Sequence, residues 1–396
     1  MDGRTKTSLT PALSRKRERG KSLEAREGAK SRERGKSYDA RLRSRVAAAV
    51  TPLIDFASDT KTRPTAGMRA AMAAAEVGDE RANEDPTVNR LNQRCAALLG
   101  KEDAVFLPSG TMANEIALAV HCRPGEEVIC DATSHIIGFE GGGPAALAGV
   151  MIQPLAGRRG IFTAEQLQAA LRPDRPYAPR QRLVVIEQTS NLGGGAIWPL
   201  ATLQGVAAVA RGASLATHMD GARLLNACVA SGIAAADFAR PFDSVWIDFS
   251  KGLGAPGGAV LAGSRAFCNE AFRLKLRWGG AMRQSGIIAA ACEYALDHQV
   301  ERLAEDHAHA RRLAEGLARI PGIAIDPAEV ETNLVYFDIT AAGLSAAAFA
   351  AALLAKGVRV TEMGATRIRA VTHLDVDAPM IERAIGAVSE LMRPAA

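Results

Sequence analysis

From about residue 52 onward, short apolar segments alternate with Ala-rich segments of helical character. Strands that alternate with helices predict a parallel sheet with right-handed crossovers and helices on both faces. The apolar segments, such as "RLVVIEQT" (182–189), are nearly continuous, which indicates a sheet buried on both sides. We therefore expect an α/β fold on a large, mostly parallel seven-stranded sheet, with strands at 103–109, 126–132, 149–156, 182–189, 215–220, 244–250 and 258–263.

The C-terminal part of the chain has a different pattern. A long helical stretch at 284–320 is followed by a strand at 332–339, a helix at 344–357, strands at 358–363 and 367–373, and a helix at 378–392. This order is typical of a small α+β unit. We predict three parts: a basic disordered extension (1–46), a large α/β domain (47–300) and a small C-terminal α+β domain (301–396).

The positive charge of the chain is concentrated in its first 46 residues. They hold 15 Lys and Arg against 6 Asp and Glu, although the whole chain has a net charge of only +5. This segment has few large apolar residues and repeats "RERGKS" at 17–22 and 32–37, so we predict that it is disordered. We interpret it as an extension that is not part of the fold. An organellar presequence, against which the six acidic residues argue, and a nucleic-acid-binding arm are the alternatives, and we do not expect nucleic acid to be a partner.

The six cysteines have no paired spacing, which argues against a disulfide framework or a zinc site. We expect no metal, and a reducing, cytoplasmic location. No apolar run reaches the roughly 18 residues that a membrane helix requires, and we expect no membrane association. No GxGxxG follows the first strand, which argues against a Rossmann dehydrogenase.

In an open α/β sheet, ligands bind at the carboxyl ends of the strands, and four features of the sequence fall there. "SGT" (109–111) opens a helix and can be an anion seat or a plain N-cap. Asp220 can be a cap or the partner of a buried cation. Lys251 can be a solvated strand end or a nucleophilic amine. His135 follows the strand at 126–132 and can be structural or can stack on a cofactor.

One cofactor uses all of these groups together. Pyridoxal phosphate requires a lysine for its aldehyde, an acid on its pyridine nitrogen and a seat for its phosphate. The sequence therefore favours a pyridoxal phosphate enzyme.

Residues 54–392 resemble the threonine aldolase family, which belongs to the fold type I, aspartate-aminotransferase-like pyridoxal phosphate enzymes. The motifs that carry the resemblance occur in the family's order: "SDTKTRPT", "EVGDERANEDPTVN", "PSGTMANE", "HMDGARLLNA", "SKGLGAP", "GGAMRQSG" and "IRAVTHLDV". The resemblance implies that Lys251 binds the cofactor aldehyde, that Asp220 pairs with the pyridinium and that His135 stacks on the ring.

The resemblance also implies the remaining binding groups. Gly110, Thr111 and the Met112 amide match the phosphate seat. Ser58, Arg223 and Arg369 match groups that hold the substrate carboxylate, a task that suits the bidentate guanidinium. Arg283 matches a residue that reaches the phosphate of a neighbouring subunit, and the family forms homotetramers or dimers.

The implied reaction is the retro-aldol cleavage of an L-3-hydroxy-α-amino acid to glycine and an aldehyde. A base must accept the β-hydroxyl proton, and His135 and an ordered water are both candidates. A β-eliminating lyase on the same scaffold is the alternative activity, and its products would be a keto acid and ammonia.

Four positions depart from the family pattern. Ala82 replaces a tyrosine, Tyr177 and Ser190 replace histidines, and Leu276 replaces a lysine. The cofactor-binding set is intact and the substrate-facing set is altered. We therefore expect a substrate such as threonine, allo-threonine or a bulkier, phenylserine-like amino acid.

Overall fold

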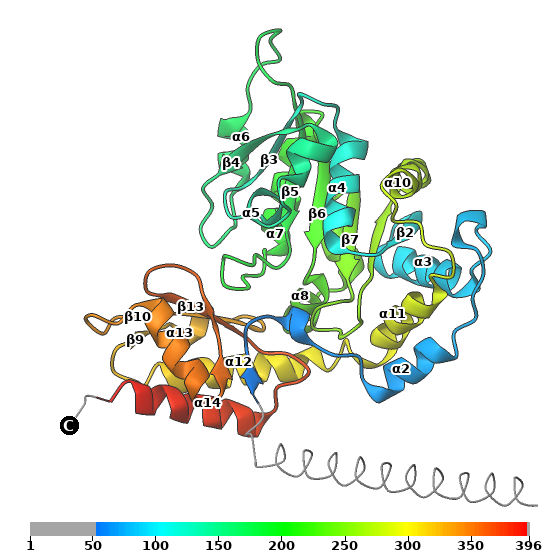
Figure 1. The fold of residues 1–396 in the computed structure, drawn as a ribbon. Helices are drawn as coiled ribbons and strands as arrows, with labels where there is room; N and C mark the ends of the chain where they lie inside the picture. The colour runs from blue at the N-terminus through cyan, green and yellow to red at the C-terminus, as the bar shows by residue number, and fades with distance from the viewer. Residues whose placement is uncertain (1–52, 394–396) are drawn as a thin grey trace, which may run out of the picture. The chain divides into compact units, whose positions relative to one another are not determined.

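The computed structural model describes residues 53–393, so the predicted basic extension (1–46) lies outside the described residues. A seven-stranded sheet forms the centre of this part of the chain (Figure 1). Its strands are adjacent in the order β2 (Asp103–Leu107), β8 (Ala259–Gly263), β7 (Ser244–Asp248), β6 (Ala216–Gly221), β5 (Gln181–Glu187), β3 (Glu127–Asp131) and β4 (Met151–Leu155). All seven predicted strands are therefore present.

The sheet is mostly parallel, as predicted, but β8 is antiparallel to both of its neighbours, β7 and β2. A parallel connection requires a crossover of a dozen or more residues, usually a helix. The segment between β7 and β8 contains no helix and spans only residues 249–258, so the chain can only turn back alongside β7. This short glycine-containing connection is the segment that carries Lys251.

Apolar side chains cover both faces of the sheet. Successive residues of a strand point to opposite faces, and Val128 and Ile129 accordingly belong to two different apolar clusters, as do Val185 and Val184. The helices packed around the sheet are α3 (Pro86–Leu99), α4 (Gly110–His121), α6 (Ala164–Ala170), α7 (Leu200–Gly212), α8 (Leu224–Ser231), α9 (Ala235–Ala239), α10 (Arg265–Arg277) and α11 (Gly286–His298). The expectation of a sheet buried on both sides is confirmed.

A second apolar core lies in the C-terminal part of the chain. It surrounds an antiparallel sheet with the strand order β12 (Thr361–Glu362), β13 (Arg367–Val371), β10 (Leu334–Ile339) and β9 (Ile323–Ala324). The helices α12 (Leu303–Leu317), α13 (Ala346–Ala355) and α14 (Ala378–Leu391) contribute to this core. Ile54 and Phe56 also pack here, and β1 (Ile54–Asp55) pairs in parallel with β11 (Val358–Arg359).

The predicted helical stretch at 284–320 is divided into α11 and α12. Ala291 and Ala295 of α11 pack in the core of the large sheet, whereas Leu313 and Leu317 of α12 pack in the second core. The break at residues 299–302 lets the chain pass from one core to the other. Among residues 53–393, no helix is long and apolar enough to cross a membrane.

The remaining short elements connect these layers. They are η1 (Asp59–Lys61), α2 (Ala66–Ala73), η2 (Glu80–Ala82), α5 (His135–Gly138), η3 (Pro144–Ala148) and η4 (Pro327–Glu329). Asp59 and His135, which begin η1 and α5, both belong to the site described below.

We predict that Phe349→Ala lowers the free energy of unfolding by about 3–5 kcal/mol, because it removes a fully buried side chain and leaves a cavity. Phe349 lies in the second core and packs edge-to-face on Phe337 at a ring-centroid distance of 5.9 Å. Leu354→Ala on the same helix is the control, because Leu354 is 45% exposed. Denaturant unfolding followed by circular dichroism measures both, and equal effects would contradict the described packing of α13.

Candidate active site

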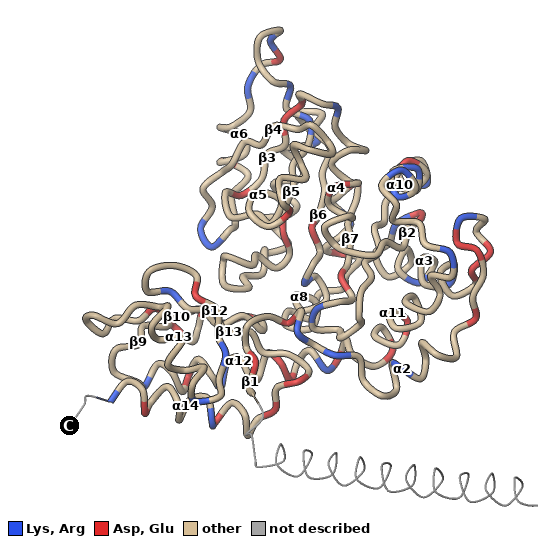
Figure 2. Tube along the Cα trace, in the orientation of Figure 1, with Lys and Arg blue, Asp and Glu red and all other residues tan. Residues whose placement is uncertain are grey.

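Acidic residues lie at the carboxyl ends of three neighbouring parallel strands. Glu187 ends β5, Asp220 is the last residue but one of β6, and Asp248 ends β7. All three are buried. Figure 2 shows acidic positions, in red, near the ends of β5, β6 and β7 and basic positions, in blue, near α8. Buried carboxylates require partners, and the partners of these three define the site.

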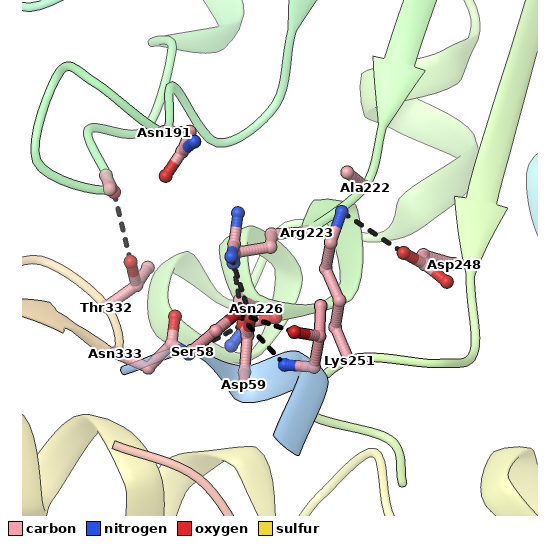
Figure 3. Close-up of polar contacts among 12 residues, drawn as sticks. Ser58, Asp59, Asn191, Ala222, Arg223, Asn226, Asp248, Lys251, Thr332 and Asn333 are labelled. Carbon is pink, nitrogen blue, oxygen red and sulfur yellow. Dashed lines mark hydrogen bonds and ion pairs between the residues drawn. The ribbon is translucent and has the colours of Figure 1, made fainter. Parts of the chain in front are cut away.

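Lys251 follows β7 and is paired with Asp248 (Figure 3). The Nζ–Oδ2 distance is 3.1 Å, and the lysine side chain is only 16% exposed. The amine also lies 5.8 Å from the centroid of the Trp246 ring. The backbone carbonyl of Lys251 accepts a hydrogen bond from Thr62 Oγ1 at 2.8 Å, which fixes the turn from a distant segment. Asp248 was not among the predicted site residues, although its position three residues before Lys251 was a usable signal.

Asp220 is held by two donors. Its Oδ2 accepts a hydrogen bond from Asn114 Nδ2 at 2.8 Å, and its Oδ1 accepts one from the Ala222 backbone N–H at 3.0 Å. Asn114 Oδ1 in turn accepts from Trp246 Nε1 at 2.7 Å. A carboxylate offers about four acceptor sites, so Asp220 keeps capacity for one further donor.

His135 lies next to Asp220 and is oriented by two glutamates. Acceptor or donor atoms of His135, Glu140 and Asp220 all lie within 4.8 Å of one another. The Nδ1 atom is 2.8 Å from Glu140 Oε1, and the backbone N–H donates to Glu187 Oε2 at 2.8 Å. Burial opposes the charged imidazolium, but the hydrogen bond to Glu140 and the nearby carboxylates raise the pKa of His135 above its ordinary value.

The N-terminus of α4 lies close to the Lys251 segment through Trp246. A Cβ atom added to Gly110 would lie 2.2 Å from Trp246 Cη2, so only glycine fits at this position. Ser109 is the N-cap, and its Oγ accepts a hydrogen bond from the Met112 N–H at 3.3 Å. Among the described residues, the Gly110 and Thr111 N–H groups have no such partner. They remain free to bind an anion, which the helix dipole favours.

Arg223 forms a buried, bidentate ion pair with Asp59 (Figure 3). Its Nε and Nη2 atoms donate to Asp59 Oδ2 and Oδ1 at 2.7 and 2.8 Å. Burial opposes ionisation of Asp59, but Arg223, Lys251 and Asn333 together hold its pKa well below the usual range. Asp59 was not predicted as a site residue, although it lies inside the "SDTKTRPT" motif beside the predicted Ser58. The arginine fork predicted for a substrate carboxylate is thus largely used by Asp59.

Arg369, unlike Arg223, has no carboxylate partner among the described residues. It lies on β13, and its Nη1 and Nη2 donate to Asn191 Oδ1 at 3.2 Å and to the Ala57 carbonyl at 3.1 Å. Its buried Nε atom has no hydrogen-bond partner among the described residues, and neither has the Tyr336 hydroxyl on the neighbouring strand. Ser58, next to Ala57, accepts hydrogen bonds from Thr60.

The structure does not bring Arg283 to Lys251. Arg283 is more than half exposed and pairs with Asp79, with an Nη1–Oδ2 distance of 2.9 Å. Its carbonyl accepts a hydrogen bond from the Glu80 N–H at 3.0 Å, which places it beside η2 and Ala82. Glu80 also forms a buried ion pair with Lys275, the neighbour of Leu276 in α10. Arg283, Asp79, Glu80 and Lys275 are linked by these contacts, and we call them, together with their chain neighbours Ala82 and Leu276, the Arg283 cluster.

The other two departures from the family pattern lie in different places. Tyr177 is 80% exposed on the segment between α6 and β5, at the end of β5 that is opposite Glu187. Ser190 is buried and lies between Glu187 and Asn191, close to the site. Of the four departures, Ser190 is thus the one that borders the site within this chain.

These groups fit pyridoxal phosphate. Lys251 is the amine, Asp220 has a free acceptor site at a buried strand end, and α4 presents free N–H groups at its N-terminus. The buried Nε of Arg369, beside Tyr336 on the neighbouring strand, forms no hydrogen bond among the described residues, and an anionic group bound there would satisfy it.

We predict that Asp59→Ala lowers the free energy of unfolding by about 3–5 kcal/mol, because it leaves the buried Arg223 guanidinium without its partner. Glu382→Ala is the matched control, since it breaks the exposed bidentate pair between Arg312 and Glu382, which contributes about 1 kcal/mol or less. Denaturant titration of both variants gives the comparison. Equal losses would show that the Asp59 pair is not buried as described.

Comparison with known proteins agrees with this geometry. Residues 55–340 match the β-eliminating lyase family model. The low specificity L-threonine aldolase of Escherichia coli (strain K12) is 40% identical over 325 residues, covering 82% of this chain and 95% of that protein. Low-specificity L-threonine aldolase 1 of Arabidopsis thaliana is 38% identical over 325 residues, covering 81% and 91%.

The Leishmania major threonine aldolase structure superposes with a TM-score of 0.73, at 22% identity, over 86% of this chain and 100% of that one. At this identity the likeness concerns the fold alone, and it confirms the predicted fold type I architecture. The sequence relatives carry the assignment further. The chain belongs to the β-eliminating lyase family, in the branch of the threonine aldolases, and is a pyridoxal phosphate-dependent lyase.

Proposed function

We propose that this protein cleaves L-3-hydroxy-α-amino acids, including L-threonine, L-allo-threonine and bulkier analogues, to glycine and an aldehyde. The observation that carries the proposal is the gathering of Lys251, Asp220 and His135 at one edge of the sheet, in a chain 40% identical to a low specificity L-threonine aldolase. When bound, pyridoxal phosphate supplies an aldehyde for the amine and an electron-withdrawing ring.

The residues of this chain divide the work of holding the cofactor. Lys251 provides the amine, and its ion pair with Asp248 holds that amine at the carboxyl edge of the sheet. Asp220 would accept the ring N–H of the cofactor, and the two hydrogen bonds that it accepts from Asn114 and Ala222 hold its carboxyl group in place. The Gly110 and Thr111 N–H groups and the Thr111 hydroxyl would bind the phosphate. Met112 belongs to the same first turn of α4, and its N–H is bonded to Ser109 Oγ.

The substrate carboxylate binds to Arg369, whose buried Nε lacks a partner, with Ser58 nearby. Arg223 supports this site with its remaining Nη1 donors and through its pair with Asp59, which belongs to the same segment as Ser58. A fixed carboxylate determines which bond at the α-carbon is oriented for cleavage.

His135 is the base that we propose for the β-hydroxyl proton. Its Nδ1–H donates to Glu140, so Nε2 carries the free lone pair. The raised pKa of His135 makes it a stronger base than an ordinary histidine. The imidazole would hold the proton, and the Glu140 carboxylate would stabilise the resulting imidazolium.

We predict that Lys251→Ala lowers kcat for cleavage of L-threonine and L-phenylserine by at least about a thousandfold, because the amine acts as part of one catalytic unit. The wild type should release glycine with acetaldehyde or benzaldehyde. Lys356→Ala is the control, because Lys356 directly follows α13 and forms an exposed ion pair with Glu390. Release of a keto acid and ammonia would instead identify a β-eliminating lyase, and activity on threonine alone would exclude the bulkier substrates.

We also propose that the protein is a homo-oligomer, a dimer or tetramer, in which Arg283 reaches the cofactor phosphate of a neighbouring subunit. Its exposed guanidinium, whose ion-pair partner among the described residues is Asp79 and not a residue of the Lys251 network, supports this role. A cytoplasmic location is proposed as well, supported by six free cysteines.

We predict that Arg283→Ala raises the Kd for pyridoxal phosphate by about tenfold, the effect of losing one charged hydrogen bond. Arg211→Ala on α7 is the control, because Arg211 is exposed, lies outside the Arg283 cluster and makes no ion pair among the described residues. Mixed oligomers of Arg283→Ala and Lys251→Ala subunits decide the geometry. If Arg283 acts across subunits, some mixed sites regain wild-type affinity and activity; no recovery would place its action within one chain or nowhere.

A further inference from the structure

Two buried glutamates lie behind His135, and only one of them has a hydrogen-bonding role in the site. Glu140 follows α5, and its Oε1 accepts hydrogen bonds from His135 Nδ1 at 2.8 Å and from Asn114 Nδ2 at 2.7 Å. Glu115 lies on α4 and is 2% exposed. Three carboxyl oxygens of this pair, both of Glu115 and Oε2 of Glu140, have no hydrogen-bond partner among the other described residues.

Gly143 places the two glutamates side by side, because its backbone N–H donates to the Glu140 carbonyl at 2.9 Å and its α-carbon lies against the Glu115 carboxyl group. Burial and a hydrogen bond between the two carboxyl groups are among the causes that raise the pKa of Glu115. The chain makes room for Glu115 with a glycine, since a Cβ atom added to Gly143 would lie 2.1 Å from Glu115 Oε1. Among residues 53–393, neither glutamate forms an ion pair with a lysine or an arginine. The basic group that contacts the pair is the His135 imidazole, which lies next to Glu140. Two carboxylates in contact, buried and without a cation, cannot both be ionised.

One carboxyl of the pair must therefore carry a proton, and the surroundings decide which. Glu140 accepts two hydrogen bonds from the site, which favour its ionised form. Glu115 accepts none, and burial together with the Glu140 carboxylate raises the pKa of Glu115 to about 8. A protonated Glu115 provides a partner for two of the three oxygens, because its O–H can donate to Glu140 Oε2.

We propose that Glu115 is a positioning residue of the active site: as a neutral carboxylic acid it donates a hydrogen bond to Glu140 and so fixes the carboxylate that orients His135. The proposal extends the proposed function, because it rests on the role of His135 there. The connection continues to the ring-nitrogen partner, since Asn114 bridges Glu140 and Asp220. Glu115 is thus connected through Glu140 to His135 and, through Asn114, to Asp220.

The interaction depends on pH. The charged and titratable groups around the pair are His135 of α5, Asp220 of β6 and Glu187 of β5, with His218 of β6 bonded to Asn114. As pH rises through the raised pKa of Glu115, the second carboxylate repels Glu140 and the support of His135 is lost. Protonated Glu115 contributes fully to the free energy of unfolding below the ordinary glutamate pKa. The contribution declines as pH rises from there to the raised pKa of the folded protein, because the unfolded chain releases this proton at a lower pH than the folded chain.

Infrared difference spectroscopy tests the proton directly. Full-length wild type and Glu115→Gln are compared at about pH 6.5 and about pH 9.5, on either side of the Glu115 pKa. We expect a carbonyl band of a protonated carboxylic acid in the wild type at the lower pH, which is absent in the variant and disappears at the higher pH. No such band at the lower pH would overturn the proposal. Because the spectra are recorded with and without pyridoxal phosphate, they report on Glu115 even if the proposed function fails.

Cofactor affinity tests the positioning role. Glu115→Gln keeps a donor at every pH, whereas Glu115→Leu removes it and leaves Glu140 Oε2 unpartnered. At about pH 6.5 we expect the Gln variant to bind pyridoxal phosphate within about twofold of wild type, and the Leu variant about tenfold more weakly. The ratio of the wild-type Kd to the Gln-variant Kd should rise at least about threefold by pH 9.5. A ratio that stays constant with pH, or a Leu variant that binds as tightly as the Gln variant, would refute the role.

Discussion

The carboxyl edge of a sheet that is buried on both faces is the constraint on which the rest of this structure depends. Charged groups that end β5, β6 and β7 cannot be solvated there, so each must find a partner within the protein. The partners are specific: Asp248 pairs with Lys251, Asp220 with Asn114, and Glu187 with the backbone of the His135 and Asn191 segments. Meeting this requirement positions the reactive side chains.

The same requirement joins distant parts of the chain. Asp59 follows Ile54 and Phe56, which pack in the second core. Its carboxylate nevertheless pairs with Arg223, which follows β6 of the large sheet. Arg369 similarly extends from β13 to the Ala57 carbonyl and to Asn191 near the large sheet. The substrate side of the site is therefore built where the two cores meet the large sheet's edge. This explains why its arginines have protein partners already.

Much of this arrangement could be predicted from the sequence, because it depends on local pattern. The seven apolar runs became the seven strands, and the rule that ligands bind at strand ends selected Lys251, Asp220 and His135 for comparison. The direction of β8 depended on a connection length, and the division at 299–302 depended on two cores competing for one helical stretch. The pairing of Asp59 with Arg223 and of Glu140 with His135 could not be predicted. These partners are 164 and five residues apart in the sequence, and neither helix nor strand periodicity indicates that they meet.

The departures from the family pattern follow from the same geometry. Ala82 and Leu276 gather around Arg283 and the buried Lys275–Glu80 pair, not around Lys251. If Arg283 enters a neighbouring subunit's site, the rest of the Arg283 cluster is carried there with it. A change at residue 82 would then alter the pocket of the partner and leave the cofactor set of its own chain untouched. In that arrangement residue 82 could vary without disturbing Lys251, Asp220 and His135, because the buried edge of the sheet holds these three within their own chain.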